Sequence, residues 1–299
     1  MSYKPFFVLI IVICCCILQV KAQSTMIFMD SDIPGQYESV LFMDSKIYPA
    51  DSLDRIIMRA GYSYAFVKDT LTGATEEGQA TLEIGRTYTK YYNRLFFETD
   101  SLVRHGIVSS YLGNKKIAGS KVGLLTFYET FIHNLQNDEW TCTGRIITQD
   151  FLYKEKSMNI EWSIQDSTKI IAGYNAVMAT CTFRGRDYTA WFTTEIPSQA
   201  GPWKFHGLPG LIISVSDKDG YYRFTLDNIY FTEGDIYLPD YLYLKTSRKK
   251  YMEAKILHET RYWVASEVYL VNSAVFVENT PESYASFTPL GNDFIETDL

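Results

Sequence analysis

The chain has 299 residues, 46% of them apolar and 15% aromatic, and its 28 basic against 35 acidic residues give a net charge of −7. Such an acidic balance argues against sequence-independent binding of nucleic acid, which needs a basic footprint to displace phosphate counterions. No linker rich in proline, glycine or serine and no block of charge divides the sequence, so one large domain is the economical interpretation.

The first 22 residues have the layout of a cleavable signal peptide. Lys4 precedes an apolar run of 13 residues, Phe6–Leu18. At about 1.5 Å of rise per residue this run is too short for the roughly 30 Å core of a bilayer. Val20 and Ala22 fit a peptidase site with small side chains, so we expect a mature chain of residues 23–299 without a transmembrane anchor. A retained, short anchor is the alternative.

The cysteines bear on lipidation and on a disulfide. Three of the five, Cys14–Cys16, lie in the apolar run and follow no glycine, alanine or serine, which argues against a lipoprotein. Cys142 and Cys181 stay in the mature chain, and export would place them where a disulfide can form. That bond would add roughly 3–4 kcal/mol of stability. Two buried free thiols on separate strands are the alternative, and both remain open.

The earlier part of the mature chain is typical of β-structure. Alternation in Gly61–Lys68 places Tyr62, Tyr64 and Phe66 on one face, and Asp69 starts a turn. Cross-strand packing of rings accounts for much of the content of 23 tyrosines. Further strands are predicted at Thr81–Ile84, Tyr88–Phe97, Gly144–Tyr153 and Ile160–Ile164.

Two hairpins follow. The first joins Ala176–Phe183 to Asp187–Thr194, with Gly185 supplying the positive φ of a tight turn. The second joins Leu211–Ser216 to Tyr221–Tyr230 through a turn rich in aspartate and glycine.

One helix is predicted at about 247–260, where long charged residues give a partly amphipathic pattern. The predicted fold class is therefore mainly β: a curved antiparallel sheet or half-barrel with few helices.

A hexapeptide, Gly207–Ile212, lies in the segment Tyr188–Asp217 and reads GLPGLI. On this motif the chain resembles the GLPGLI family of exported proteins from Bacteroidota-type bacteria. The lead-in resembles the same family, and so do two weaker upstream blocks, so that the resemblance extends over most of the mature chain. These further segments are Ala190–Trp191, Glu195–Pro197, Gly201–Pro202 with Phe205, Ile171–Tyr174 and Leu82–Gly85.

The resemblance implies an exported protein of the periplasm or cell envelope. The family carries no assigned catalytic residues that could be transferred to this chain. Its members tend to approach their end with an Asn-Pro pair, where this chain has Thr288-Pro289.

The motif itself predicts a turn. Pro209 fixes φ near −65° and Gly210 can supply positive φ, so Leu208–Leu211 suits a type II turn. One interpretation is a buried corner that leads the chain into the next strand. The other is a loop that lines the mouth of an apolar ligand cavity, with Trp203, Phe205, His206, Leu208, Pro209 and Leu211 as ligand-binding candidates.

Named catalytic motifs are absent from the sequence: it contains no mature Cys-x-x-Cys, His-Glu-x-x-His, Gly-x-Ser-x-Gly, phosphate-binding loop or dinucleotide fingerprint. We therefore assign no catalytic residue, no metal ligand and no cofactor. Glu195 and Asp187 could pair with Arg184, Arg186 or Lys204, although charges beside a hairpin are usually solvated.

The function expected from the sequence is non-catalytic. The protein would hold an apolar small molecule in the concave side of its sheet, or dock onto another envelope component through exposed strand edges. The alternative is an envelope hydrolase or metal-binding protein that uses the region of Glu195 and His206.

Overall fold

A computed structural model describes residues 51–71, 73–94, 129–146, 149–260 and 295–298, all within one compact unit, Lys46–Leu299. The predicted signal peptide lies outside these residues. The described elements are β1 (Ser52–Arg55), β2 (Met58–Asp69), β3 (Ala74–Ile84), β4 (Tyr88–Asn93), β5 (Thr130–Asn134), β6 (Glu139–Ile146), β7 (Gln149–Lys156), β8 (Ser163–Ile171), β9 (Tyr174–Phe183), β10 (Arg186–Thr193), β11 (Leu211–Asp217), β12 (Tyr222–Tyr230), β13 (Asp235–Tyr237), β14 (Leu244–Thr246) and α2 (Arg248–Thr260).

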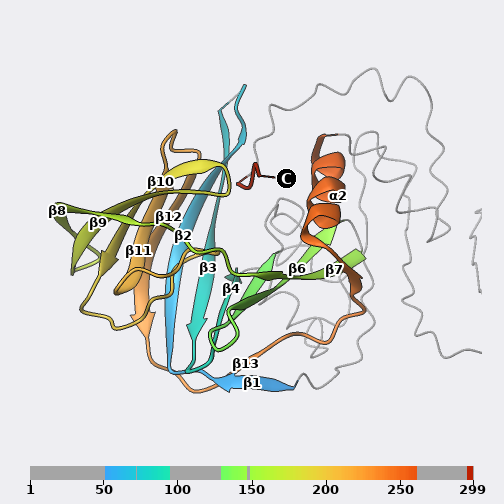
Figure 1. Cartoon of the computed structure of the whole chain (residues 1–299), viewed down its shortest axis with the longest axis horizontal. Coiled ribbons are helices and arrows are strands. Elements are labelled where there is room, and N and C mark those ends of the chain that lie inside the picture. The colour runs from blue at the N-terminus through green and yellow to red at the C-terminus, as the bar shows by residue number, and fades with distance from the viewer. Residues whose placement is uncertain (1–50, 72, 95–128, 147–148, 261–294, 299) are drawn as a thin grey trace, which may run out of the picture. The chain divides into compact units, whose positions relative to one another are not determined.

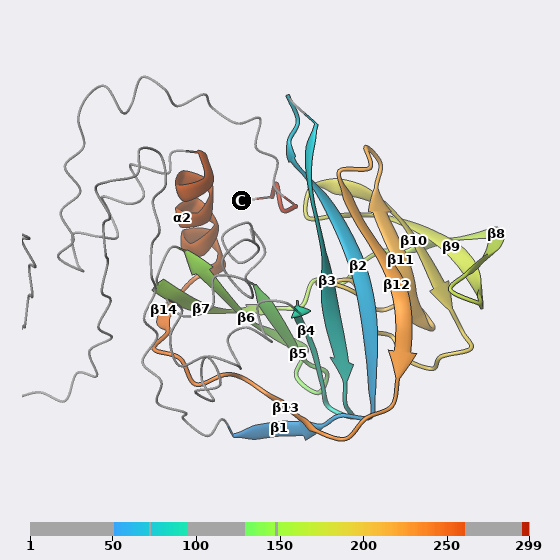
Figure 2. The same cartoon turned by 180° about the vertical axis from the view of Figure 1, so that it is seen from behind.

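Most of the strands form one curved sheet (Figures 1 and 2). Its order is β14-β7-β6-β5-β4-β3-β2-β12-β11-β10-β9-β8, so β14 and β8 are end strands and the sheet is not closed into a barrel. The prediction of a mainly β, curved sheet is confirmed. Its antiparallel character holds for all pairs of this sheet but one, because β14 runs parallel to β7. A separate ribbon pairs β1 with β13.

Tyrosine and phenylalanine rings hold the centre of the sheet together. The predicted face of β2 is confirmed, since Tyr62 and Tyr64 are buried and Phe66 packs against the core. On the neighbouring strand β12, Phe224 lies opposite Tyr64, and Tyr222 lies opposite Phe66. These ring pairs stabilise the pairing of two strands that lie far apart in the sequence.

Both predicted hairpins are confirmed. In the first, Arg184 and Gly185 have φ of 51° and 82°, which is the backbone of a two-residue turn with positive φ at both positions. The second hairpin joins β11 and β12, whose strands pair in antiparallel register. The order β9-β10-β11-β12 follows the chain.

The predictions for the middle of the chain were less accurate. Gly144–Tyr153 was predicted as one strand, but β6 ends at Ile146 and β7 begins at Gln149, and the two pair antiparallel. The break between the two strands could not be predicted from the sequence, because Ile147 and Thr148 are not residue types that favour turns. β3 is longer than predicted, β8 begins at Ser163, and β4 ends at Asn93.

Helix α2 is confirmed close to its predicted bounds. The Ser247 hydroxyl accepts a weak hydrogen bond from the Lys250 amide at 3.4 Å, as an N-cap residue does. Tyr251 packs between α2 and the sheet, and Gly144 makes room for it, because a Cβ there would lie 1.9 Å from the Tyr251 hydroxyl. No helix among the described residues is long and apolar enough to cross a membrane.

Cys142 on β6 and Cys181 on β9 are free thiols, buried on different strands. The structure thus matches the second of the two alternatives left open by the sequence. Burial raises the pKa of each thiol to about 12, so both are protonated at neutral pH.

Candidate functional site

The segment between β10 and β11, residues 194–210, folds back on itself and carries the GLPGLI motif. Ala200 and His206 form an isolated bridge, and the Gly207 amide donates to the Gln199 carbonyl at 2.9 Å. The Ile212 amide donates to the Ala200 carbonyl at 3.0 Å, which ties the start of β11 to the segment. Part of the backbone hydrogen bonding of this segment is therefore made within the segment and with the start of β11.

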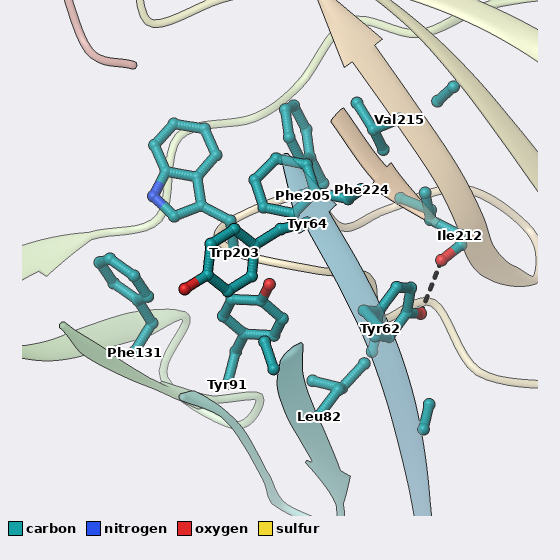
Figure 3. Packing of buried hydrophobic residues seen from close by; sticks show 14 of the residues in the cluster. Tyr62, Tyr64, Leu82, Tyr91, Phe131, Trp203, Phe205, Ile212, Val215 and Phe224 are labelled. Carbon is teal, nitrogen blue, oxygen red and sulfur yellow. Dashed lines mark hydrogen bonds between the residues drawn. The ribbon is translucent and has the colours of Figure 1, made fainter. Parts of the chain in front are cut away.

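Four of the six ligand-binding candidates belong to the hydrophobic core: Trp203, Phe205, Leu208 and Leu211. The Trp203 ring lies 5.2 Å from that of Phe205 and 5.6 Å from that of Phe183. Figure 3 shows Trp203 and Phe205 among Phe131, Tyr64 and Tyr91, and the hydrogen bond of Tyr62 to the Ile212 carbonyl. Of the other two candidates, Pro209 is exposed and His206 is half-buried. Their role in binding a ligand stays a prediction.

The turn predicted within the motif is wrong in one respect. Positive φ occurs at Gly207, at 92°, and not at Gly210, so Leu208–Leu211 is not a type II turn. Gly210 is needed for space instead. A Cβ on Gly210 would lie 2.1 Å from the carbonyl oxygen of Thr193, at the end of β10. The Gly210 amide donates to the Leu208 carbonyl at 2.8 Å, which makes a tighter, three-residue turn around Pro209.

His206 belongs to a half-buried polar network. Its Nδ1 donates to the Lys204 carbonyl at 2.9 Å, and its Nε2 contacts the Ser157 hydroxyl at 2.9 Å. That hydroxyl also accepts a hydrogen bond from Trp140 Nε1 at 3.2 Å. The His133 ring stacks on Trp140 with centroids 4.1 Å apart. Both ring nitrogens of His206 are thus occupied by protein groups, which is the arrangement of a structural histidine.

Glu195 lies in a different set of contacts. Its carboxylate accepts hydrogen bonds from the Asn175 amide at 2.8 Å and from the Asn175 side chain at 3.0 Å. No described contact joins Glu195 to His206. Among the residues that the structure describes, no group of three or more histidine, cysteine or acidic side chains could hold a metal ion.

Lys204 is the centre of a buried group of charges. Its side chain is 1% exposed, and its Nζ lies 2.7 Å from Glu155 and 2.5 Å from Glu296. It also donates to the Tyr153 hydroxyl at 3.3 Å. Burial by itself would lower the pKa of Lys204, but nearby Cys142, Glu296 and Glu155 raise it above its usual value. Lys204 is therefore a buried, charged ammonium group.

Two arginines complete the group. Arg184 lies 2.6 Å from Glu155 and 3.2 Å from Asp298. Arg248, in the first turn of α2, lies 2.6 Å from Glu296 and 2.5 Å from Asp298. Three cations and three anions thus meet where the hairpin, β7, α2 and the C-terminal residues come together. We call this set the charged cluster: Arg184, Lys204, Arg248, Glu155, Glu296 and Asp298.

Only part of the charged cluster could be anticipated. Sequence reasoning considered Arg184 and Lys204, but it offered Glu195 and Asp187 as their partners. In the structure Asp187 accepts instead from the Thr182 hydroxyl at 2.6 Å. Glu155, Arg248, Glu296 and Asp298 were missed, since no local pattern links residues that are 29, 48 and 114 positions apart.

Acid is expected to weaken the charged cluster. Burial would raise the pKa of Glu296, but Lys204 and Arg248 outweigh it and lower the pKa from 4.5 to about 2. The stability that this carboxylate contributes is thus fully present above pH 4.5 and is lost as pH falls through about 2. This shift corresponds to about 3 kcal/mol.

The measurement is the free energy of unfolding of the native chain and of Glu296→Gln across that pH range. The native chain should be more stable at pH 7, and the difference should shrink toward zero as Glu296 takes up its proton. A difference that does not change with pH would contradict the assignment of charge.

Comparison with protein families gives a match that includes the same segment. Residues 182–214 match a family described as "Protein of unknown function (Porph_ging)". The matched stretch contains Arg184, Lys204, His206 and the whole GLPGLI hexapeptide. No curated protein matches the chain.

Two solved structures of PNGF-II, from two crystal forms, resemble the chain with TM-scores of 0.48 and 0.44. The sequence identities are 12% and 14%, and each match covers 69% of this chain. The chain spans about a third of the length of these structures, with 34% and 33% of the PNGF-II chains covered.

Proposed function

We propose that this chain is an exported cell-envelope protein of the GLPGLI type that works without catalysis, by docking onto another envelope component along the open edge strand β8. The observation that carries the proposal is the exposure of this end strand. Seven of its nine residues are exposed and none is buried, and Ile164 and Ile170 expose 53% and 74% of their surface. An end strand with exposed apolar side chains offers unpaired backbone groups to another strand.

The register of β8 with β9 limits the part of β8 that can pair with another strand. The register with β9 shifts between Ile164 and Thr168, which is an irregularity that limits strand addition. From Thr168 to Ile171 the pairing with β9 is regular. The occupant we propose is an extended segment of another envelope protein that pairs with these four residues and covers Ile170 with apolar side chains.

Docking is favoured over transport of an apolar molecule by the burial of the motif. Trp203, Phe205 and Leu208 point into the core and pack against other side chains, so they already have apolar partners. A carrier would instead need such side chains around an open apolar cavity. Export and the GLPGLI assignment are supported by the short apolar run Phe6–Leu18 and by the hexapeptide within the matched residues.

The test is site-specific photo-cross-linking in cells that export the protein. A photoreactive amino acid at Ile170 should give one discrete cross-linked partner, and the same amino acid at Phe231 should not. Phe231 is a matched control because it is 79% exposed and lies outside β8. Ile170→Lys should remove the partner from a pull-down without loss of stability, because the position is at the surface.

The proposal of docking at β8 is contradicted if the photoreactive amino acid at position 170 captures no protein, or if positions 170 and 231 capture the same proteins. Export is checked separately by the intact mass of the purified protein, which should correspond to a chain that begins at Gln23.

A further inference from the structure

The C-terminal residues Ile295–Asp298 are held in the way that a bound peptide is held. The Thr297 amide donates to the Arg184 carbonyl at 3.0 Å, and Arg248 donates to the Asp298 carbonyl at 3.1 Å. The Tyr188 hydroxyl donates to the Ile295 carbonyl at 3.3 Å. The segment joins no strand of the sheet in the described part of the chain. Its removal therefore breaks no ladder of backbone hydrogen bonds.

Side chains at alternate positions of this segment carry the charge. Glu296 and Asp298 both meet Arg248, whereas Thr297, between them, is exposed. Arg248 donates from Nε to Glu296 and from Nη2 to Asp298, and its Nη2 also lies 2.6 Å from Glu296. Such charge-assisted contacts are both strong and directional. The spacing is that of an extended chain, in which positions i and i+2 share a face.

The charge of the cluster matches this occupant. Without the segment, Glu155 is the only anion among the described residues that pairs with Arg184, Lys204 and Arg248, which leaves an excess of two positive charges in this set. Two carboxylates two residues apart neutralise that excess. A buried excess of charge is unfavourable, so the vacated cluster would select an acidic segment over a neutral one.

The surroundings leave space beside the occupant. At Gly185 a Cβ would lie 2.1 Å from the Thr297 hydroxyl, so glycine permits the close approach of the segment. A polar groove of about 320 Å³ lies next to Thr297, between the turns at 185–187 and 217–219. Arg184 Nε is buried and makes no hydrogen bond with any described residue, so one donor of the cluster is left unused by the segment.

We propose that Arg184, Lys204 and Arg248 form a binding site for an acidic polypeptide segment with two carboxylates two residues apart. The chain's own residues 295–298 are its resident, displaceable occupant. The competing occupant is an acidic segment of another protein. This site is distinct from the β8 edge, so a negative result for docking at β8 does not contradict it.

The test uses the full chain with Glu296→Gln and Asp298→Asn, which keeps the shape of the resident segment but removes its charge. The probe is a fluorescent heptapeptide of residues 293–299. Its anisotropy should report binding to the double variant at least about tenfold tighter than to the native chain. The same peptide with glutamine and asparagine at the two acidic positions should not bind, and Arg248→Gln added to the double variant should abolish binding of the acidic peptide.

A second form of the protein provides a test that does not depend on the folding of the double variant. A protease site placed within residues 285–294 allows the native, folded chain to be cut so that its last residues are held without a covalent bond. Excess acidic peptide should then displace the cut fragment, as seen by native mass spectrometry. A folded double variant that binds no peptide, or a cut fragment that never exchanges, would overturn the proposal.

One further outcome identifies the source of the competing segment. If the native chain forms a dimer that Arg248→Gln removes, the segment comes from a second copy of this chain. The assignment of the binding site then stands.

Discussion

Replacement of Lys204 by methionine should lower the free energy of unfolding by about 3–5 kcal/mol, because it removes one partner of a buried group of charges. The side chain is 1% exposed and contacts both Glu155 and Glu296. Methionine keeps most of the volume, so the loss reports charge more than packing. Glu155 and Glu296 would then share Arg184 and Arg248 in an interior with excess negative charge. The midpoint and slope of urea unfolding at pH 7 measure the effect.

Lys154→Met is the matched control, since Lys154 lies on the same segment of β7 as Glu155. It pairs with Glu139 at 2.9 Å, but its side chain is 59% exposed. Surface pairs of this kind contribute about 0–1 kcal/mol. Equal losses of unfolding free energy in Lys204→Met and Lys154→Met would show that the charged cluster contributes no more to stability than a surface ion pair.

The second large effect is expected at Gly210, in the GLPGLI motif. Gly210→Ala should cost about 3 kcal/mol or more, at the upper end of what overpacking a core costs. The new Cβ would meet the backbone of Thr193 and Thr194, which cannot rotate away as a side chain does. Thermal unfolding followed by circular dichroism gives the loss, and a variant that fails to fold gives the same answer.

Gly207→Asn separates the two glycines of the motif. Gly207 needs a positive φ of 92°, but a Cβ there meets nothing closer than 3.9 Å. Asparagine tolerates positive φ better than other residues, so the cost should be about 1 kcal/mol. A larger loss at Gly207 than at Gly210 would contradict the different roles that the structure gives them.

Local features of the fold could be predicted from the sequence. Gly185 and the turn at 217–220 mark the two hairpins, and alternating tyrosines mark the buried face of β2. The β6–β7 connection could not be predicted, because Ile147 and Thr148 lack the chemistry of a turn. The parallel pairing of β14 with β7 depends on a contact between distant segments, for which no local signal exists.

The candidate site was harder to predict than the fold. Trp203, Phe205 and Leu208 are apolar, and composition cannot tell a cavity wall from a filled core. Positive φ was predicted at Gly210 and not at Gly207, because a Pro-Gly pair is typical of a type II turn. The close approach of the Thr193 backbone to Gly210 has no signal in the sequence. From the sequence, Lys204 was interpreted as a solvated charge beside a hairpin. Only its distant partners, Glu155 and Glu296, make it the centre of a buried cluster.

The order of the sheet also has a consequence for folding kinetics. β2 to β7 follow one another in the chain and in space, and so do β8 to β12, so each set can assemble from neighbouring strands. The pairing of β2 with β12 is the strand pairing that joins the two meanders in the described sheet, and it closes a loop of well over a hundred residues. Loop closure costs entropy before the contact is made, so pairings of this kind form slowly. We expect the two meanders to form first and the pairing of β2 with β12 to limit the folding rate, together with the hydrogen bond from Tyr62 on β2 to the Ile212 carbonyl on β11.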